Sequence, residues 1–512
     1  MHQKFKGKPT YVYTAIMNTI QMYDAQACTI KIEDIATNVN NRIVLERMRR
    51  NNANDCNNST LYIQNQHDED GYGCVDYVPE GAHDMGWLGY FVGKNEHLKD
   101  LVVKWFTPTS GSTSEVLEPF FKGLSRNRSL SIIQFTGIDL LGGRVFTMMD
   151  PFFNINTNIN HIKIDDCNFG EEGGRLFALA LASSTNSSLK SFMLDNNSIE
   201  GDVLVDIITS LSMHPHLNGL YLIGDRLSIN GCTALSTLLQ HSVTQLQHID
   251  LSNNEINDEG MEVLVPALKN CSRLKDLKLC SNPQVTNKGW QHLASILEAP
   301  NSNITELNLY GSNIDDDALT AFANALVNNK TLTMLHLNGN QAITERGWQS
   351  LSNLLCDTSS VNATFLSNHT LQHINTKDSL RSLIELNKTK DKKEVAMIKI
   401  VRHHNVFDMM PFFEWEFKVL PLMIHWFEKA SLMFRYKARL LSNIKGRKFS
   451  CIYQFVRGMP VLYVKASLKK ELDDIKAELS QMEGESTERK QQLERREMSI
   501  TERLGPQRSS MS

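Results

Sequence analysis

The sequence has no marked excess of either charge and no long apolar run, and both absences narrow its possible functions. It carries 53 lysine and arginine residues against 57 aspartate and glutamate residues, a formal net charge of -4 at pH 7. Binding to nucleic acid requires a concentrated basic surface, so we expect no nucleic-acid partner. The most apolar window, residues 406–427, contains five ionisable side chains and is not expected to span a membrane.

The sequence also lacks the cysteine pattern of a secreted protein. Its nine cysteines are scattered, their number is odd, and no C-x-x-C pair occurs. This usage favours reduced thiols over a disulfide framework. The first twenty residues contain no continuous apolar segment of the kind that secretory signals carry. We therefore expect a cytoplasmic protein, with a nuclear location as the other possibility.

Sequence motifs of common catalytic sites are missing. The segment GYFVGKN ends like a phosphate-binding loop, but Leu88 stands where that loop begins with glycine and Asn95 where it ends with serine or threonine. The motifs H-E-x-x-H and G-x-S-x-G do not occur either. His403 and His404 are adjacent, so on a helix they point in different directions and make a poor metal pair. We expect a protein that is not an enzyme and holds no metal or cofactor.

What the sequence does contain is a repeat. The spacing L-x-x-L-x-L-x-x-N-x-I is clearest in LKSFMLDNNSI from Leu189 and LQHIDLSNNEI from Leu246, and it returns every 28 to 32 residues. A period this regular indicates a stack of similar structural units. The copies begin at Leu98, Leu130, Ile159, Leu189, Leu217, Leu246, Leu274, Ile304, Leu332 and Val361.

Each copy has two halves with different periods. In the first half, residues such as Leu246 and Leu251 are spaced to point inward from a short strand. In the second half, residues such as Leu264 and Leu268 are spaced to share one face of a helix. One copy cannot bury these faces alone, so neighbouring copies stack. The prediction is an α/β solenoid with parallel strands on the concave inside and helices outside.

A polar residue follows each predicted strand at a fixed place. An asparagine amide at that place can satisfy backbone groups of the adjacent turns. Asparagine stands there as Asn197, Asn254, Asn282 and Asn340, while other copies have Cys167, Asp225, Ser312 and His369, and the first two have Phe106 and Ile138.

These residues resemble the ribonuclease-inhibitor-type, or RNI-like, leucine-rich repeat. That type is shared by ribonuclease inhibitor, the sensing arms of NOD-like receptors and Ran GTPase activators. The resemblance covers about residues 86–389. It implies a horseshoe of repeats and does not specify a partner. The segments GWLGYFVGKN and FFEWEFKVLP resemble algal-type members of the family, a match that implies no particular activity.

The predicted solenoid of about ten copies spans residues 86–389 and is preceded by a cap region, residues 1–85. Leu88 and Val92 stand before the first copy as helix residues stand before later copies, so a degenerate copy should precede it. Its strand is predicted to be TLYI. The acidic and glycine-rich stretch from Gln64 to Asp84 should be an insertion or a mobile loop.

Beyond the repeats, residues 390–463 are dense in aromatic side chains and should form a helical cap, with a docking surface or a membrane-surface helix as alternatives. Residues 464–504 should form a charged helix, and residues 505–512 a disordered tail. Heptad spacing favours either a lone helix or a short coiled coil, which could join two copies of the chain through residues 464–483 as a weak homodimer. The heptad residues are Leu468, Leu472, Ile475, Leu479 and Met482.

Residues that flank the inward leucines should face outward on the concave side. They are mixed in sign and include aromatics, a composition typical of protein interfaces. We expect a non-catalytic scaffold that binds a protein partner on this concave face. The candidate partner-binding residues are Lys163, Asp195, Tyr221, His248, Asp250, Lys278, Glu306, Tyr310 and His336.

Two other functions remain as alternatives. The first is a regulator of a small GTPase, which the resemblance to Ran activators implies. Those proteins carry a long acidic tail, whereas the tail of this sequence is mixed in charge and rich in arginine. The second is a catalytic domain within residues 390–512.

Overall fold

The computed structural model describes residues 9–52, 59–64, 75–104, 113–140, 143–167, 170–184, 188–199, 201–240, 245–374, 378–404, 467–480 and 488–504. The chain divides into two compact units. Residues 1–354 and 370–385 form the first unit, and residues 355–369 and 386–512 form the second. The aromatic-rich part of the expected cap and the final tail lie outside the described residues.

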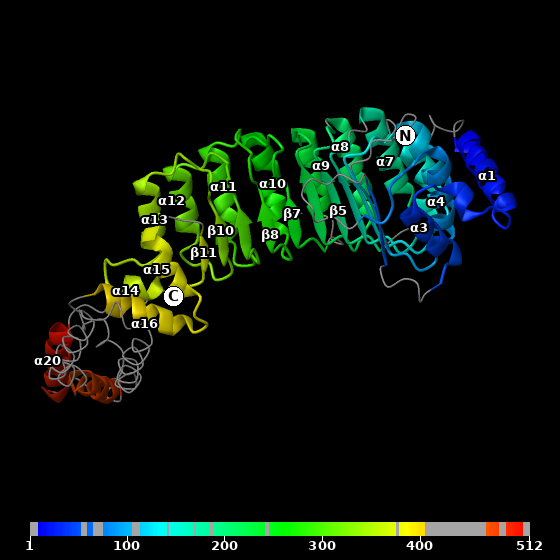
Figure 1. Ribbon diagram of the computed structural model, residues 1–512. Helices are drawn as coiled ribbons and strands as arrows, with labels where there is room; N and C mark the ends of the chain where they lie inside the picture. Colours follow the sequence, from blue (N-terminus) through cyan, green and yellow to red (C-terminus); the bar gives the residue numbers. More distant parts are fainter. Residues whose placement is uncertain are drawn as a thin grey trace. The chain divides into compact units, whose positions relative to one another are not determined.

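The first unit is built on one parallel sheet of eleven strands that follow each other in chain order (Figure 1). Every strand pairs in parallel with the strand of the next copy, which confirms the predicted leucine-rich-repeat solenoid. The strands are β1 (Thr60–Ile63), β2 (Asp100–Lys104), β3 (Ile132–Thr136), β4 (His161–Asp165), β5 (Ser191–Asp195), β6 (Gly219–Ile223), β7 (His248–Asp250), β8 (Asp276–Lys278), β9 (Glu306–Asn308), β10 (Met334–His336) and β11 (His373–Ile374).

A helix connects each strand to the next, and in Figure 1 these helices lie along one side of the sheet. Three further helices, α1 (Pro9–Gln26), α2 (Ile32–Ile35) and α3 (Val39–Arg50), precede the first strand. The connecting helices are α4 (Ala82–Lys94), α5 (Thr113–Leu124), α6 (Arg144–Ile155), α7 (Gly170–Ser183), α8 (Asp202–Ser210), α9 (Ile229–Gln240), α10 (Asp258–Asn270), α11 (Asn287–Glu298), α12 (Asp316–Ala325) and α13 (Glu345–Leu355), with α15 (Asp378–Asn387) after β11.

The core of the first unit lies between the sheet and these helices. Leu246 and Leu251, which the spacing predicts to point inward, are fully buried, and so are Leu264 and Leu268 on α10. Burial of each such side chain contributes roughly 1.5–3 kcal/mol. Because the same positions are filled in copy after copy, one continuous apolar layer joins the repeats.

The predicted role of the asparagine after each strand is confirmed. The Asn254 amide donates to the Leu222 carbonyl of the preceding copy at 2.5 Å, and its oxygen accepts from the Asp225 backbone N–H of that copy at 3.2 Å. Asn340 does the same with the Leu309 carbonyl and the Ser312 N–H. These side chains therefore form a buried ladder that links each turn to the one before it.

The N-terminal cap contains the strand that the sequence predicts at TLYI. This strand, β1, pairs with β2 over its whole length. From the stretch predicted as an insertion or mobile loop, Tyr77 returns to β1, where its N–H donates to the Tyr62 carbonyl at 3.0 Å. The Tyr77 side chain is fully buried, and its hydroxyl donates to Asp84 at the start of α4. This part of the stretch is thereby fixed against the sheet.

The last copy is placed wrongly by the sequence. The spacing predicts a strand from Val361, but Val361–Leu366 form a helix, α14, whose first turn is capped by the Ser360 hydroxyl. The strand of this copy is β11, where Ile374 pairs with Leu335 of β10. An inserted segment between α13 and β11 imitates the leucine spacing, and its serine cap favours the helix.

In the second unit, α14 packs against α16 (Lys392–His403) around a buried lysine. Lys399 is fully buried, and its ammonium group donates to the carbonyls of Leu355 and Asn368 at 2.6 and 3.3 Å. The lysine therefore satisfies two backbone carbonyls within this unit.

The heptad residues of the C-terminal region pack within the same chain. Residues 467–480 are helical, and Leu472 and Ile475 form an apolar cluster with Ile500 of α20 (Glu488–Leu504). Arg489 and Arg496 of α20 bond to Glu478 and Glu471 on the opposite helix. The pair therefore forms a helical hairpin. Across the described residues of both units, no helix is long and apolar enough to cross a membrane.

Candidate functional site

The side chains of β4 to β10 that point away from the core form a surface that we call the strand face. The strand register places its central members side by side, one from each copy. This central row consists of Lys163, Met193, Tyr221, Asp250, Lys278, Asn308 and His336. Because successive side chains of a strand point to opposite faces, these residues share the face opposite to the buried leucines.

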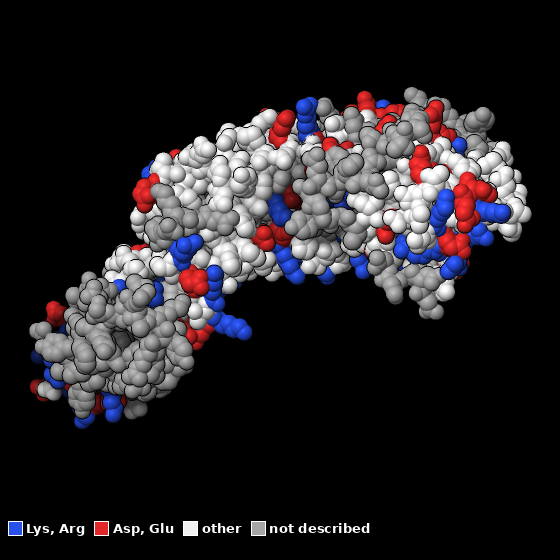
Figure 2. All heavy atoms as spheres, in the orientation of Figure 1, with Lys and Arg blue, Asp and Glu red and all other residues white. Residues whose placement is uncertain are grey.

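Charged side chains of neighbouring strands pair across this face. The Lys278 ammonium lies 3.8 Å from an Asp250 carboxylate oxygen, and Asp250 also accepts from the Ser252 hydroxyl at 2.6 Å. The His336 ring lies 3.4 Å from the Glu306 carboxylate. Figure 2 shows acidic and basic side chains together over the part of the sheet that contains β7 and β8. The strand face is therefore a surface of alternating charge.

Carboxylates outnumber their cationic partners in the middle of the strand face. Asp195 pairs with Asp165 in the register, and burial together with the charges of Asp165 and Asp250 raises the pKa of Asp195 to about 6. Burial and the Glu306 charge also raise the pKa of Asp276, whose Oδ1 is shielded from solvent and has no hydrogen-bond partner among the described residues. Added positive charge would stabilise both carboxylates.

A hollow lies on the strand face at Gly219, where that strand position carries no side chain. The Tyr221 ring occupies part of this space, because a Cβ atom on Gly219 would stand 2.8 Å from the ring. The hollow has a volume of about 610 Å³ and is also lined by His161, Lys190 and His216. A half-buried tyrosine beside open space is a surface that a partner side chain can contact.

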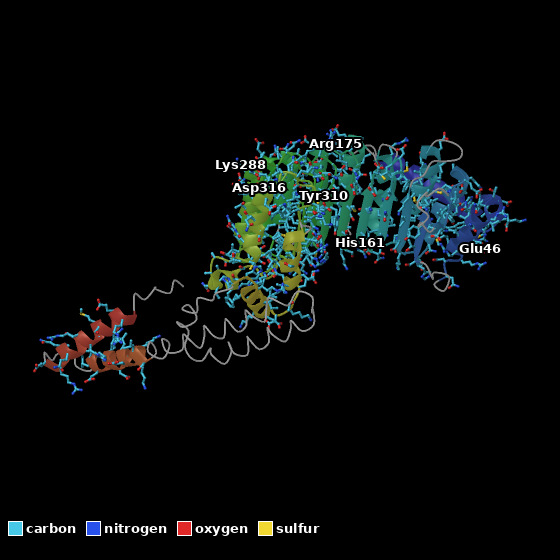
Figure 3. All side chains as sticks on the ribbon, turned by 60° about the vertical axis from the view of Figure 1, so that its left-hand side comes forward. Glu46, His161, Arg175, Lys288, Tyr310 and Asp316 are labelled. Atoms are coloured by element: carbon cyan, nitrogen blue, oxygen red, sulfur yellow. The ribbon has the colours of Figure 1, made fainter. Side chains whose placement is uncertain are left out.

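The structure brings together some predicted partner-binding residues and separates others. Asp250 and Lys278 form one pair, and Glu306 and His336 form another. Tyr310 follows β9 and is 52% exposed, without a charged partner among the described contacts (Figure 3). The remaining predicted members, Lys163, Asp195, Tyr221 and His248, extend the same face over β4 to β7.

Two features of this face are not predicted from the sequence. The first is the pairing of His248 with Asp276 at 3.6 Å, because strand alternation places both residues on this face without showing that they contact each other. The second is the hollow at Gly219, which exists because this strand position has no side chain. The sequence patterns considered above describe which side chains are present, so they do not predict it. A glycine at an outward strand position between larger residues was the available signal.

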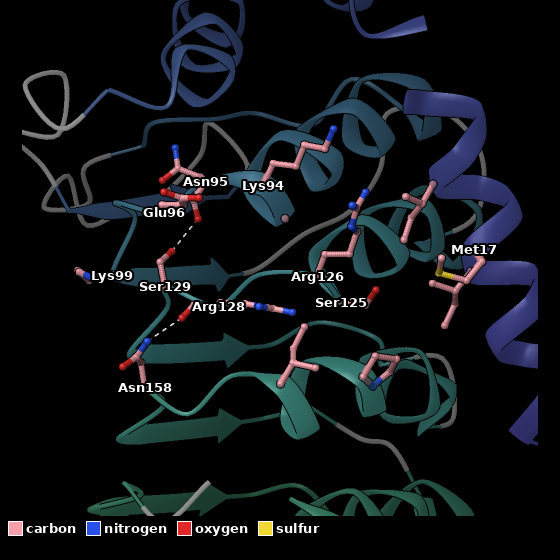
Figure 4. A pocket seen from close by; sticks show the side chains of 15 residues that line it. Met17, Lys94, Asn95, Glu96, Lys99, Ser125, Arg126, Arg128, Ser129 and Asn158 are labelled. Atoms are coloured by element: carbon pink, nitrogen blue, oxygen red, sulfur yellow. Dashed lines mark hydrogen bonds between the residues drawn. The ribbon is translucent and has the colours of Figure 1, made fainter. Parts of the chain in front are cut away.

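A second hollow, of about 710 Å³, lies between α1 and the ends of α4 and α5 (Figure 4). Lys94 and Arg126 line it, but both pair with the same Asp24 carboxylate, at 2.6 and 3.4 Å. The single Asp24 carboxylate offsets one of these two positive charges, and Lys99, Arg128 and Glu96 also line the hollow. Throughout the chain segments that the structure describes, no three metal-ligating side chains gather into a possible metal site.

Comparison with known families and curated proteins finds similarity to leucine-rich-repeat sequences. The family described as "Leucine Rich repeat" matches residues 244–265, 301–323 and 328–352. NACHT, LRR and PYD domains-containing protein 14 of Mus musculus is 28% identical over 291 residues, which is 54% of this chain and 28% of that protein. Protein 4C of the same series in Mus musculus is 30% identical, over 40% of this chain and 21% of that protein. The chain thus spans about a quarter of the length of these relatives.

Chains of two solved structures also align with this chain. The Rad7 and Elc1 complex of yeast contains a chain that aligns with a TM-score of 0.39 and 13% identity, covering 72% of this chain and 82% of that one. A TLR13–ssRNA13 complex aligns with a TM-score of 0.30 and 15% identity, covering 54% of this chain and 39% of that one.

Proposed function

We propose that this leucine-rich-repeat protein is a non-catalytic scaffold that binds a protein partner on its strand face. The observation that carries the proposal is the row of outward side chains, one from each copy, that the register aligns across β4 to β10 and in which Tyr221 lies among charged residues. Aromatic anchors among scattered charges are typical of protein interfaces. Repetition extends this surface over several copies, which suits a large partner better than a small molecule.

The charge of the strand face also bears on the chemistry of the partner. Asp195 and Asp276 are held close to other carboxylates, and the pKa values of both are raised. A partner that carries lysine or arginine side chains would relieve this repulsion on binding. We therefore propose that the partner presents a surface with basic residues to the middle of the strand face.

The proposal is tested by capture of partners from cell extract on the immobilised full chain. A double variant, Tyr221→Ala with Tyr310→Ala, removes the two aromatic side chains of the strand face. Its matched control, Leu179→Ala with Val327→Ala, removes two exposed apolar side chains away from the strands, of which Leu179 is 48% exposed on α7 and Val327 47% exposed after α12. Circular dichroism of both variants establishes that they are folded.

We expect the wild-type chain and the control variant to retain the same proteins, and the tyrosine variant to lose at least one of them. Identical retention by all three proteins would contradict binding through the strand face. Loss of the same proteins from both variants would indicate a general effect on folding or on exposed apolar area.

We also propose that the protein acts inside the cell, in the cytoplasm or the nucleus. Cys167 and Cys232 are buried free thiols, and Cys28 is an exposed one. Free thiols persist most readily in the reducing compartments of the cell. Imaging of the tagged full-length chain tests this proposal.

A further inference from the structure

A hollow of about 910 Å³ on the N-terminal cap, beside α3, is lined by an excess of positive charge. Five cationic side chains line it against the two carboxylates of Glu33 and Glu46. The cationic side chains are Lys31, Arg42, Arg47, Arg49 and Arg50. We call this the α3 hollow. In Figure 2, Lys and Arg side chains gather at the end of the first unit that contains α3.

Most of these arginines are held in place by one bond each. The Arg42 Nε donates to the Ala36 carbonyl at 2.7 Å, and an Arg49 Nη donates to the Ile30 carbonyl at 3.3 Å. The Arg50 Nε pairs with Glu46 at 3.1 Å. A guanidinium group has five N–H donors, so each of these contacts fixes the group and leaves donors for another acceptor.

Arg47 lacks even one such contact. Its Nε and Nη2 are shielded from solvent and have no hydrogen-bond partner among the described residues. A buried donor on a charged group that lacks an acceptor destabilises the fold, so an acceptor is expected there. The basic residues in the last turn of α3 also interact favourably with the negative end of the helix dipole. The dipole, however, requires only their charge and does not account for N–H groups that are shielded from solvent and unbonded.

The helix that carries these arginines is itself firmly positioned. Asn38 caps its first turn, and the Glu80 carboxylate bonds to the backbone of Thr37 and Asn38 and to the buried Asn41 amide. At the other end, Asn51 accepts from the Glu96 N–H at 2.8 Å. The backbone that carries the arginines is therefore fixed, and only the Arg47 side chain has to turn for its shielded N–H groups to reach an anion in the hollow.

We propose that the α3 hollow binds a phosphate group, with Arg47 as its central ligand and Arg42 and Arg50 beside it. A phosphate monoester carries nearly two negative charges and several acceptor oxygens, which match the planar fork of a guanidinium. The group can belong to a soluble phosphate or to a phospholipid headgroup. The hollow beside α1 has a smaller excess of positive charge. Its four cationic side chains, Lys94, Lys99, Arg126 and Arg128, lie with the carboxylates of Glu96 and Asp24, and Asp24 pairs with two of them.

The test measures binding of inorganic pyrophosphate to the full chain by isothermal calorimetry. Binding of vesicles that contain a phosphatidylinositol phosphate is measured in parallel by sedimentation, against vesicles of phosphatidylcholine alone. We expect Arg47→Gln to weaken pyrophosphate binding roughly ten-fold or more, the loss of a charge-assisted hydrogen bond. Arg47→Lys keeps the charge but not the fork, and we expect an intermediate loss. Pyrophosphate binding without vesicle binding assigns a soluble ligand, and binding of both assigns a headgroup.

Two further variants keep the result interpretable. Arg50→Gln replaces Arg47→Gln in the test if the latter variant is unstable. The Arg50 side chain is 62% exposed, so its substitution should weaken binding without unfolding the cap. Arg175→Gln on α7, remote in sequence and also paired with a glutamate, removes the same charge and should leave binding unchanged (Figure 3). Absence of pyrophosphate binding to the wild type, an equal loss in the Arg175 variant, or tighter binding of a poly-glutamate peptide would overturn the proposal.

Discussion

Asp225 is the one carboxyl group in the described asparagine ladder, and its substitution by asparagine should stabilise the protein in a pH-dependent way. Its Oδ1 accepts from the backbone N–H groups of Asn197 and Ile199, as an asparagine oxygen would. Its Oδ2 is buried without a hydrogen-bond partner. In other copies the amide at this place donates to a strand carbonyl of the preceding copy, and the equivalent carbonyl here is that of Leu194. Only a protonated carboxyl can make that bond.

The magnitude follows from the titration of this group. Burial raises the pKa of Asp225 to about 7, whereas an aspartate in the unfolded chain titrates near 3.9. Because the folded-state pKa is the higher one, the contribution to stability is fully present below about pH 4 and is lost as the pH rises to about 7. At about 1.4 kcal/mol for each pH unit, the total loss is about 4 kcal/mol.

Asp225→Asn removes this titration. We expect the free energy of unfolding of the variant, measured by urea denaturation and circular dichroism, to exceed that of the wild type by an amount that grows from about pH 4 to pH 7 and then levels off. Asn254→Asp should introduce the same pH dependence into the next rung.

A difference between Asp225→Asn and the wild type that is constant with pH would refute the protonated-carboxyl reasoning. So would a variant less stable than the wild type above pH 7, because the asparagine would then have failed to supply the missing donor.

Two other predictions concern packing. Leu251→Ala should lower the free energy of unfolding by roughly 2–5 kcal/mol, since Leu251 is fully buried in the apolar layer, and an unchanged chemical melt would contradict its inward position. A homodimer through residues 464–483 would have to open the hairpin in which Leu472 and Ile475 already contact α20. We therefore expect sedimentation velocity to show a monomer, and a dimer that Leu472→Asp abolishes would show that the hairpin opens.

The sequence predicts the solenoid well because its determinants are local and repeated. The inward leucines and the ladder asparagines recur at fixed spacing. The leucines are buried in copy after copy, and each asparagine bonds to the same backbone groups of the copy before it. The last copy shows the limit of this reasoning. Val361, Thr364 and Leu366 imitate the repeat spacing, yet Leu366 is 61% exposed and the Thr364 hydroxyl bonds to the Asp357 carbonyl. Spacing alone does not separate a strand from one helical turn.

The candidate sites divide in the same way. Strand alternation is sufficient to place Tyr221 and Asp250 on the outward face, because the period of a strand is fixed. The α3 hollow is different. Its arginines look like an ordinary charged helix in the sequence, and the missing partners of Arg47 arise only when α2, α3 and the loop before them come together. The sequence pattern of a single segment therefore cannot show that the Arg47 guanidinium lacks hydrogen-bond partners among the described residues.

The asparagine ladder also has a direction. Asn282 satisfies the backbone N–H groups of Asn254 and Ile256 in the copy before it, and Asn254 in turn satisfies Asp225. Each ladder side chain thus accepts from backbone N–H groups of the copy before it. The N–H groups of its own turn are bonded by the ladder side chain of the next copy. During synthesis on the ribosome, a newly emerged copy keeps open donors until its successor arrives. The two ends of the solenoid are therefore not equivalent. Loss of C-terminal copies leaves backbone N–H groups of the new last turn without their side-chain acceptor, whereas loss of N-terminal copies leaves the side-chain amide of the new first rung without its partners in the preceding copy.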